Sequence, residues 1–160
     1  MRRRACGAEG DDVSLSEWIS PSADPAPAGS VVGVRVLAQA RQLLMLRALA
    51  ETVALMAEFA LDEVTDIRVA LDEIATALIE RAVPGSSIEC DFGYDGDRMS
   101  VAVTAVAVTP EALHRDGLGW HVLTSITDSL EATTAPFDSA VAGYPVTVEF
   151  RRLRRHGSTA

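Results

Sequence analysis

The stretch DIRVALDEIATALIERA, residues 66–82, decides the fold of this 160-residue chain. Its apolar residues recur at intervals of three and four, the period of a helix that buries one face. We expect this helix to begin near Leu61 and to end before Pro84-Gly85, a stop signal. The stripe that faces the core consists of Val64, Ile67, Leu71, Ile74 and Leu78.

The sequence on either side of this helix supplies a second helix and several strands. A leucine- and alanine-rich helix is expected over residues 40–59, and a shorter helix over residues 120–127. Apolar and polar residues alternate as in half-buried strands at 32–36, 88–94, 99–103, 130–133 and 146–150, with a hairpin turn at 95–97. Thr109-Pro110 is expected to open a short helical turn. The fold class is therefore an α/β (α+β) two-layer sandwich, a mostly antiparallel sheet with helices on one face.

Length and composition indicate one soluble domain. The chain is 48% hydrophobic and 23% charged, and no window approaches the roughly 20 apolar residues of a membrane span. Arg2-Arg3-Arg4 is not followed by an apolar run, so it does not resemble a secretory signal. Cys6 and Cys90 are expected to stay reduced in the cytoplasm. We divide the chain into a flexible segment 1–30, a domain 31–152 and a tail 153–160.

The charge is strongly acidic in the middle of the chain. Residues 31–150 hold seven arginines and 18 acidic residues, a net charge of −11, and the chain has no lysine. Such a field repels nucleic acid and favours a basic protein partner, although it also serves solubility alone. The arginines 151, 152, 154 and 155 are read as a solvated basic end, because no aromatic residues accompany them.

Two places carry candidate site chemistry. Glu73 lies at the edge of the apolar face of the 66–82 helix, where partial desolvation suits a carboxylate for general-base work; an exposed helix acid beside Asp72 is the plainer interpretation. Gly117 and Gly119, in the stretch DGLGWH of residues 116–121, precede a helix whose free N–H groups could receive an anion, or form only a tight turn. No metal site is expected, because the histidines lack partners at ligand spacing.

These stretches, in this order, resemble the anti-sigma factors that are serine/threonine kinases of the histidine-kinase-like (GHKL, Bergerat-fold) ATPase superfamily, and most closely the actinobacterial type that restrains sigma-F-like factors. Residues 67–76 resemble the N-box helix of that family, and residues 117–124 resemble its second glycine box. Gly143 fits its last glycine-marked segment. The resemblance covers roughly residues 31–152.

The resemblance implies a nucleotide site with specific gaps. In active relatives the N-box glutamate is the general base, an asparagine four residues on holds Mg²⁺, and an aspartate in a first glycine box reads adenine. Here Glu73 is present, but Ala77 stands at the metal position, and residues 103–110 contain neither aspartate nor glycine. Asp72 or Thr76 would have to hold the metal, and only Arg115 and backbone donors around Gly117, Leu118 and Gly119 would meet phosphate.

The resemblance, with these positions lost, therefore favours a protein that binds a partner over an active enzyme. We expect weak ATP and Mg²⁺ binding at best. The partners implied are an alternative sigma factor of the stress or sporulation type, an anti-anti-sigma (STAS-type) protein that releases it, and a second copy of the chain. The alternative is an active kinase that phosphorylates the anti-anti-sigma factor, with Glu73 as base.

Overall fold

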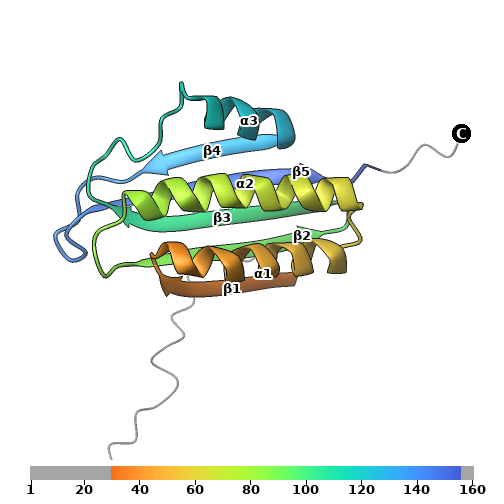
Figure 1. Ribbon diagram of the computed structural model, residues 1–160, viewed down its shortest axis with the longest axis horizontal. Coiled ribbons are helices and arrows are strands. Elements are labelled where there is room, and N and C mark those ends of the chain that lie inside the picture. The colour runs from red at the N-terminus through yellow and green to blue at the C-terminus, as the bar shows by residue number, and fades with distance from the viewer. Residues whose placement is uncertain (1–29, 156–160) are drawn as a thin grey trace, which may run out of the picture.

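A computed structural model describes residues 30–155, so the predicted segment 1–30 and the last residues of the predicted tail lie outside the described residues. Within this range the chain forms five strands and three α-helices (Figure 1). In chain order these are β1 (Ser30–Leu37), α1 (Leu43–Met56) after a 3-10 turn (Ala40–Gln42), α2 (Leu61–Glu80), β2 (Ser87–Asp95), β3 (Arg98–Ala107), α3 (Leu118–Ile126), β4 (Ser129–Thr134) and β5 (Tyr144–Leu153).

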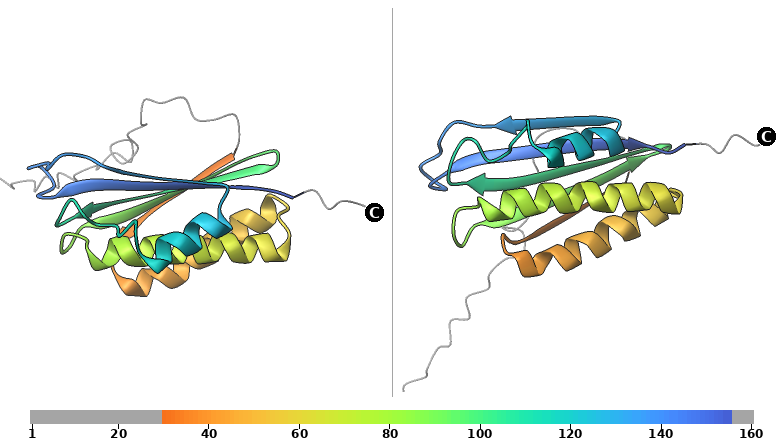
Figure 2. Two further views of the ribbon diagram at one scale, coloured as in Figure 1. Left: turned by 90° about the horizontal axis from the view of Figure 1, so that it is seen from above. Right: turned by 45° about the horizontal axis from the view of Figure 1, so that its top comes forward.

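The predicted two-layer sandwich is confirmed. The sheet has the order β1-β2-β3-β5-β4 and every neighbouring pair is antiparallel. Figure 2 shows the three helices on one face of this sheet. Alternate residues of the central strands point toward the helices and are buried, which is the period-two pattern of a sheet covered on one side. This inner layer includes Ile88, Cys90, Phe92, Val101, Val103, Val146, Val148 and Phe150.

The α2 helix matches its prediction closely. Its predicted apolar stripe is buried in full, and it begins at Leu61. The backbone N–H of Ala60 donates to Glu63 at 3.0 Å, which satisfies one of the free groups at the start of the helix. The α1 helix ends at Met56 rather than Phe59, because Glu58 takes a left-handed conformation with φ of 59°.

The predicted helical turn at Pro110 is wrong. Residues 108–117 form an irregular connection between β3 and α3. Two contacts with other parts of the fold account for the difference. Ala112 is buried in the core, and the guanidinium of Arg81, directly after α2, donates to the carbonyl of Glu111 at 3.4 Å. The carbonyl of Glu111 therefore accepts a hydrogen bond from Arg81 instead of one from the backbone of a local helical turn.

The prediction of a solvated arginine end is wrong for Arg152. The β5 alternation continues through this residue, so its side chain points inward and is only 3% exposed. It forms ion pairs with Asp66 of α2 at 3.1 Å and with Asp128 at 3.3 Å. Arg154 pairs with Glu58 and Asp97, so this end of β5 is joined to the α1–α2 connection and to the β2–β3 turn.

Gly143 allows a close approach that a side chain would block. A Cβ placed there would lie 2.6 Å from Cγ1 of Val106 and 2.7 Å from the carbonyl oxygen of Ala107. Gly143→Ala is therefore expected to lower the free energy of unfolding by about 1–3 kcal/mol, measured by urea denaturation. Ala142→Gly is the neighbouring control, because Ala142 has a left-handed φ of 54° and glycine relieves that strain. A Gly143→Ala midpoint equal to that of the wild type would contradict the expectation.

Cys90 is a buried free thiol, and burial, followed by the neighbouring charge of Asp91, raises its pKa to about 12. Because the thiolate is the reactive form, Cys90 should not react with a thiol reagent at pH 7 in the folded protein. A Cys6→Ala variant leaves Cys90 as the one thiol, because Cys6 and Cys90 are the two cysteines of the chain. Labelling of this variant should occur only after unfolding, and fast labelling of the native protein would contradict the assignment.

No helix among residues 30–155 is long and apolar enough to cross a membrane.

Candidate functional site

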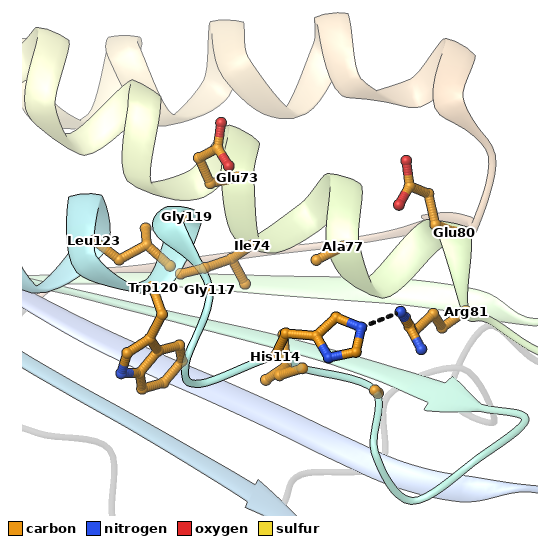
Figure 3. A pocket seen from close by; sticks show the side chains of 12 residues that line it. Glu73, Ile74, Ala77, Glu80, Arg81, His114, Gly117, Gly119, Trp120 and Leu123 are labelled. Atoms are coloured by element: carbon orange, nitrogen blue, oxygen red, sulfur yellow. Dashed lines mark hydrogen bonds between the residues drawn. The ribbon is translucent and has the colours of Figure 1, made fainter.

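A small cavity of about 170 Å³ lies between α2, α3 and the β3–α3 connection. Figure 3 shows that α2 forms one wall and that the connection and the start of α3 form the other. The wall on α2 carries Glu73 and Ala77, which lie four residues apart on one stripe of the helix, and Arg81 directly follows the last residue of α2. The apolar part of the lining comes from Ile74, Ala112, Leu113, Trp120 and Leu123.

Glu73 meets the N-terminus of α3. A Cβ at Gly119 would lie 3.3 Å from Oε2 of Glu73, so the glycine lets the first turn of α3 come close to this carboxylate. Gly117 is the N-cap of α3 and provides no side-chain hydrogen bond. The positive end of the helix therefore faces a carboxylate of the protein itself, which is a favourable arrangement. An incoming anion at this helix end would have to approach Glu73.

The other end of the cavity is closed by a bond that the sequence did not reveal. A guanidinium nitrogen of Arg81 lies 2.6 Å from Nε2 of His114 on the connection (Figure 3). Arg81 follows Ala77 by four residues, the same spacing as between Glu73 and Ala77, so the sequence could have predicted it as a site residue. His114 could not be paired with it from the sequence, because the path of an irregular connection has no period to read.

The structure brings together only half of the predicted site residues. Glu73, Ala77, Gly117 and Gly119 line the cavity. The other four, Asp72, Thr76, Arg115 and Leu118, are not part of its lining.

The structure shows where three of these four side chains lie instead. Asp72 lies on the side of α2 that faces α1, where it pairs with Arg47 at 2.6 Å. Arg115 donates to the carbonyl of Ala132 on β4 and lies over the ring of Trp120 at 5.7 Å. Leu118 is 80% exposed.

A nucleotide with Mg²⁺ does not fit the residues of this cavity. Its volume lies below the roughly 300–1,000 Å³ of ligand pockets. Within the described residues no cluster of three histidine, cysteine or acidic side chains could hold a metal ion. Glu73 and Glu80 both line the cavity, but they lie seven helical steps apart, about 10 Å along the axis, which is too far for one ion. Both also repel phosphate, and Arg81 is already engaged.

Comparisons with known proteins give one kind of relative. The chain is 28% identical, over 148 residues, to the anti-sigma-F factor RsbW of Mycobacterium tuberculosis, in strains CDC 1551 and H37Rv, and the match covers 88% of each chain. The resemblance to the anti-sigma factors is confirmed. No protein-family model matches the chain. The match extends over far more than the cavity, so the likeness to RsbW concerns the whole domain.

Proposed function

We propose that this protein is an anti-sigma factor that binds an alternative sigma factor in the cytoplasm and keeps it from RNA polymerase. The observation that carries the proposal is the match to the anti-sigma-F factor RsbW, which covers 88% of both chains. The sigma factor is of the stress or sporulation type, and an anti-anti-sigma protein releases it. The protein acts as a homodimer of the GHKL fold.

The charge of the domain supports a basic protein partner. The net charge of −11 over residues 31–150 favours surfaces that otherwise contact DNA. Complementary charge mainly speeds encounter and excludes wrong partners, so the association rate should fall as salt rises.

A second candidate function is a serine/threonine kinase that acts on the anti-anti-sigma protein. One observation favours it: Glu73 lines the cavity beside Gly119, at the start of α3, as a general base would. The volume of the cavity, Ala77 and the engaged Arg81 oppose it. We therefore place the function in binding rather than in turnover.

The test is reconstitution with the sigma factors of the organism that encodes this chain. The full-length protein is mixed with each alternative sigma factor, and the complex is followed by gel filtration and by transcription from the cognate promoter. One sigma factor should co-elute and lose its transcription, and an added anti-anti-sigma protein should restore it without any nucleotide. Failure of every sigma factor to co-elute at micromolar concentrations would overturn the proposal.

The same reconstitution separates the two functions. Release that needs ATP, with phosphate appearing on the anti-anti-sigma protein, would establish the kinase. Glu73→Ala should then abolish the phosphate transfer and spare sigma binding. Release without ATP, unchanged in Glu73→Ala, supports a protein that works by competition between partners.

A further inference from the structure

The α1 helix exposes apolar side chains where a surface helix normally exposes polar ones. Only Arg47, Glu51 and Thr52 among its 14 residues are polar. One side of the helix is buried against α2 and the sheet, including Leu46, Ala50 and Val53. The outward side, which we name the α1 outer face together with the first residue of α2, has these exposed fractions: Leu44 75%, Met45 43%, Leu55 48%, Met56 64% and Leu61 76%.

A helix that is apolar on all sides is normally covered on all sides. In Figure 1, α1 is the outermost helix of its layer, with α2 on one side only. The hydroxyl of Thr52 donates to the carbonyl of Ala48, so even this polar group on the face is satisfied within the helix. The exposed positions of α2, by contrast, include the charged residues Asp62, Arg68 and Glu73. Several exposed large apolar side chains on one face of a helix are typical of an interaction surface.

We propose that the α1 outer face is the docking site of this chain's own N-terminal segment, residues 12–20. The proposal does not depend on the proposed function. That segment carries Val13, Leu15, Trp18 and Ile19, the large apolar residues found between residues 11 and 30. It lies outside the described residues; the position of Ser30, the length of the linking chain and the charges favour it as the occupant.

The described chain begins at the end of the molecule where α1 ends and α2 begins. Ser30 pairs with Tyr94 at the end of β2, beside the turn that holds Asp97. The guanidinium of Arg154 donates hydrogen bonds both to Asp97 and to Glu58 of the α1–α2 connection. The start of β1 therefore lies at the same end of the sandwich as Met56 and Leu61.

The linking chain is long enough. Ten residues lie between Ile19 and Ser30, and the eleven extended steps from one to the other span up to about 36 Å. The α1 helix, with 14 residues, is about 21 Å long. Trp18 and Ile19 can therefore reach any point on the α1 outer face without moving β1.

The charges are complementary as well. No basic residue occurs between Arg4 and Arg35, and the segment carries Asp12 and Glu17 beside its apolar residues, with Asp11 directly before it. Arg41 lies in the 3-10 turn directly before α1, and Arg68 of α2 shares a shallow pocket with Arg47 of α1; the side chains of Arg41 and Arg68 form no hydrogen bond or ion pair with any residue of the described range 30–155. Two free cations at the border of an apolar face favour an acidic, apolar segment over a basic one.

The chain provides a direct reporter of this contact. Trp18 and Trp120 are its two tryptophans, so a full-length Trp120→Phe variant leaves Trp18 as the only source of tryptophan emission. Docked Trp18 should emit at a blue-shifted wavelength and be poorly quenched by acrylamide. Leu44→Glu and Leu55→Glu in this background should shift the emission to the red and raise the quenching constant several-fold. Both positions are exposed, so neither change disturbs the core.

Leu118→Glu is the matched control, because Leu118 is 80% exposed on α3, outside the α1 outer face. It should leave the emission of Trp18 unchanged. If Trp120→Phe alters the circular dichroism spectrum, the emission of Trp18 is obtained instead by subtracting the spectrum of a Trp18→Phe variant.

Three results would overturn the proposal. Emission from Trp18 that is red and fully quenchable in the full chain means that the segment does not dock. Blue emission that is insensitive to Leu44→Glu and Leu55→Glu places the docking elsewhere. Blue emission that is lost on dilution, together with a fall in mass by light scattering, assigns the contact to a second copy of the chain.

Discussion

Replacing Arg152 by alanine is expected to lower the free energy of unfolding by about 3 kcal/mol. Arg152 is 3% exposed, and its guanidinium joins β5 to Asp66 on α2 at 3.1 Å and to Asp128 at 3.3 Å. Breaking a buried ion pair from one side is costly because the remaining charge loses its partner in a poorly hydrated place. Here both carboxylates keep about a third of their surface in water, so the loss should lie at the lower end of the usual range.

Urea denaturation of Arg152→Ala and Arg151→Ala measures this effect with a control from the same strand. Arg151 is exposed, and it pairs with Glu149, its neighbour two residues away, at 2.8 Å. An exposed pair of this kind contributes less than about 1 kcal/mol. A double-mutant cycle of Arg152→Ala with Asp66→Asn then isolates the coupling to α2. Equal losses for Arg151→Ala and Arg152→Ala would show that burial of Arg152 contributes nothing.

Arg152 also shows which part of the fold was readable from the sequence. The spacing of apolar residues was sufficient to predict α2, β2 and β3. Buried positions repeat every 3.6 residues in a helix and every 2.0 in a strand, whichever elements pack against them. The same period of two runs from Val146 through Phe150 to Arg152. Grouping Arg152 by charge with its neighbours, rather than by period, gave the wrong exposure.

The site was less readable, for a physical reason. Glu73 and Ala77 follow from the helical period, and Gly117 and Gly119 from their place before a helix. Closure of the cavity depends on the contact between Arg81 and His114, and on Ala112 being pulled into the core. These are long-range contacts of an irregular segment, and neither the period nor the turn chemistry of residues 108–117 specifies them. Pro110 alone favoured a turn that tertiary contacts then replaced.

Titration of the purified protein with Mg-ATP or Mg-ADP is expected to give no saturable heat up to millimolar concentrations. The cavity of about 170 Å³ is smaller than the roughly 300 Å³ at which ligand pockets begin. Ala77 offers no oxygen to a metal ion, and the carboxylate of Glu73 already lies against the start of α3, where phosphate would bind. Calorimetry of the wild type, Glu73→Ala and Arg81→Ala measures which of these features prevents nucleotide binding.

The wild type and the two variants show whether nucleotide is excluded by the lack of phosphate and metal ligands or by the Arg81–His114 contact across the cavity. Arg81→Ala removes the bond to His114 and so frees the connection, but it adds no phosphate or metal partner, and we expect it to bind nucleotide no better than the wild type. Gain of micromolar binding in Arg81→Ala would mean that closure alone excludes nucleotide. Micromolar, Mg²⁺-dependent binding to the wild type would contradict the expectation outright and favour the kinase function. Glu73→Ala would then keep the heat of binding and lose phosphate transfer, because a general base acts on the bond being made rather than on nucleotide affinity.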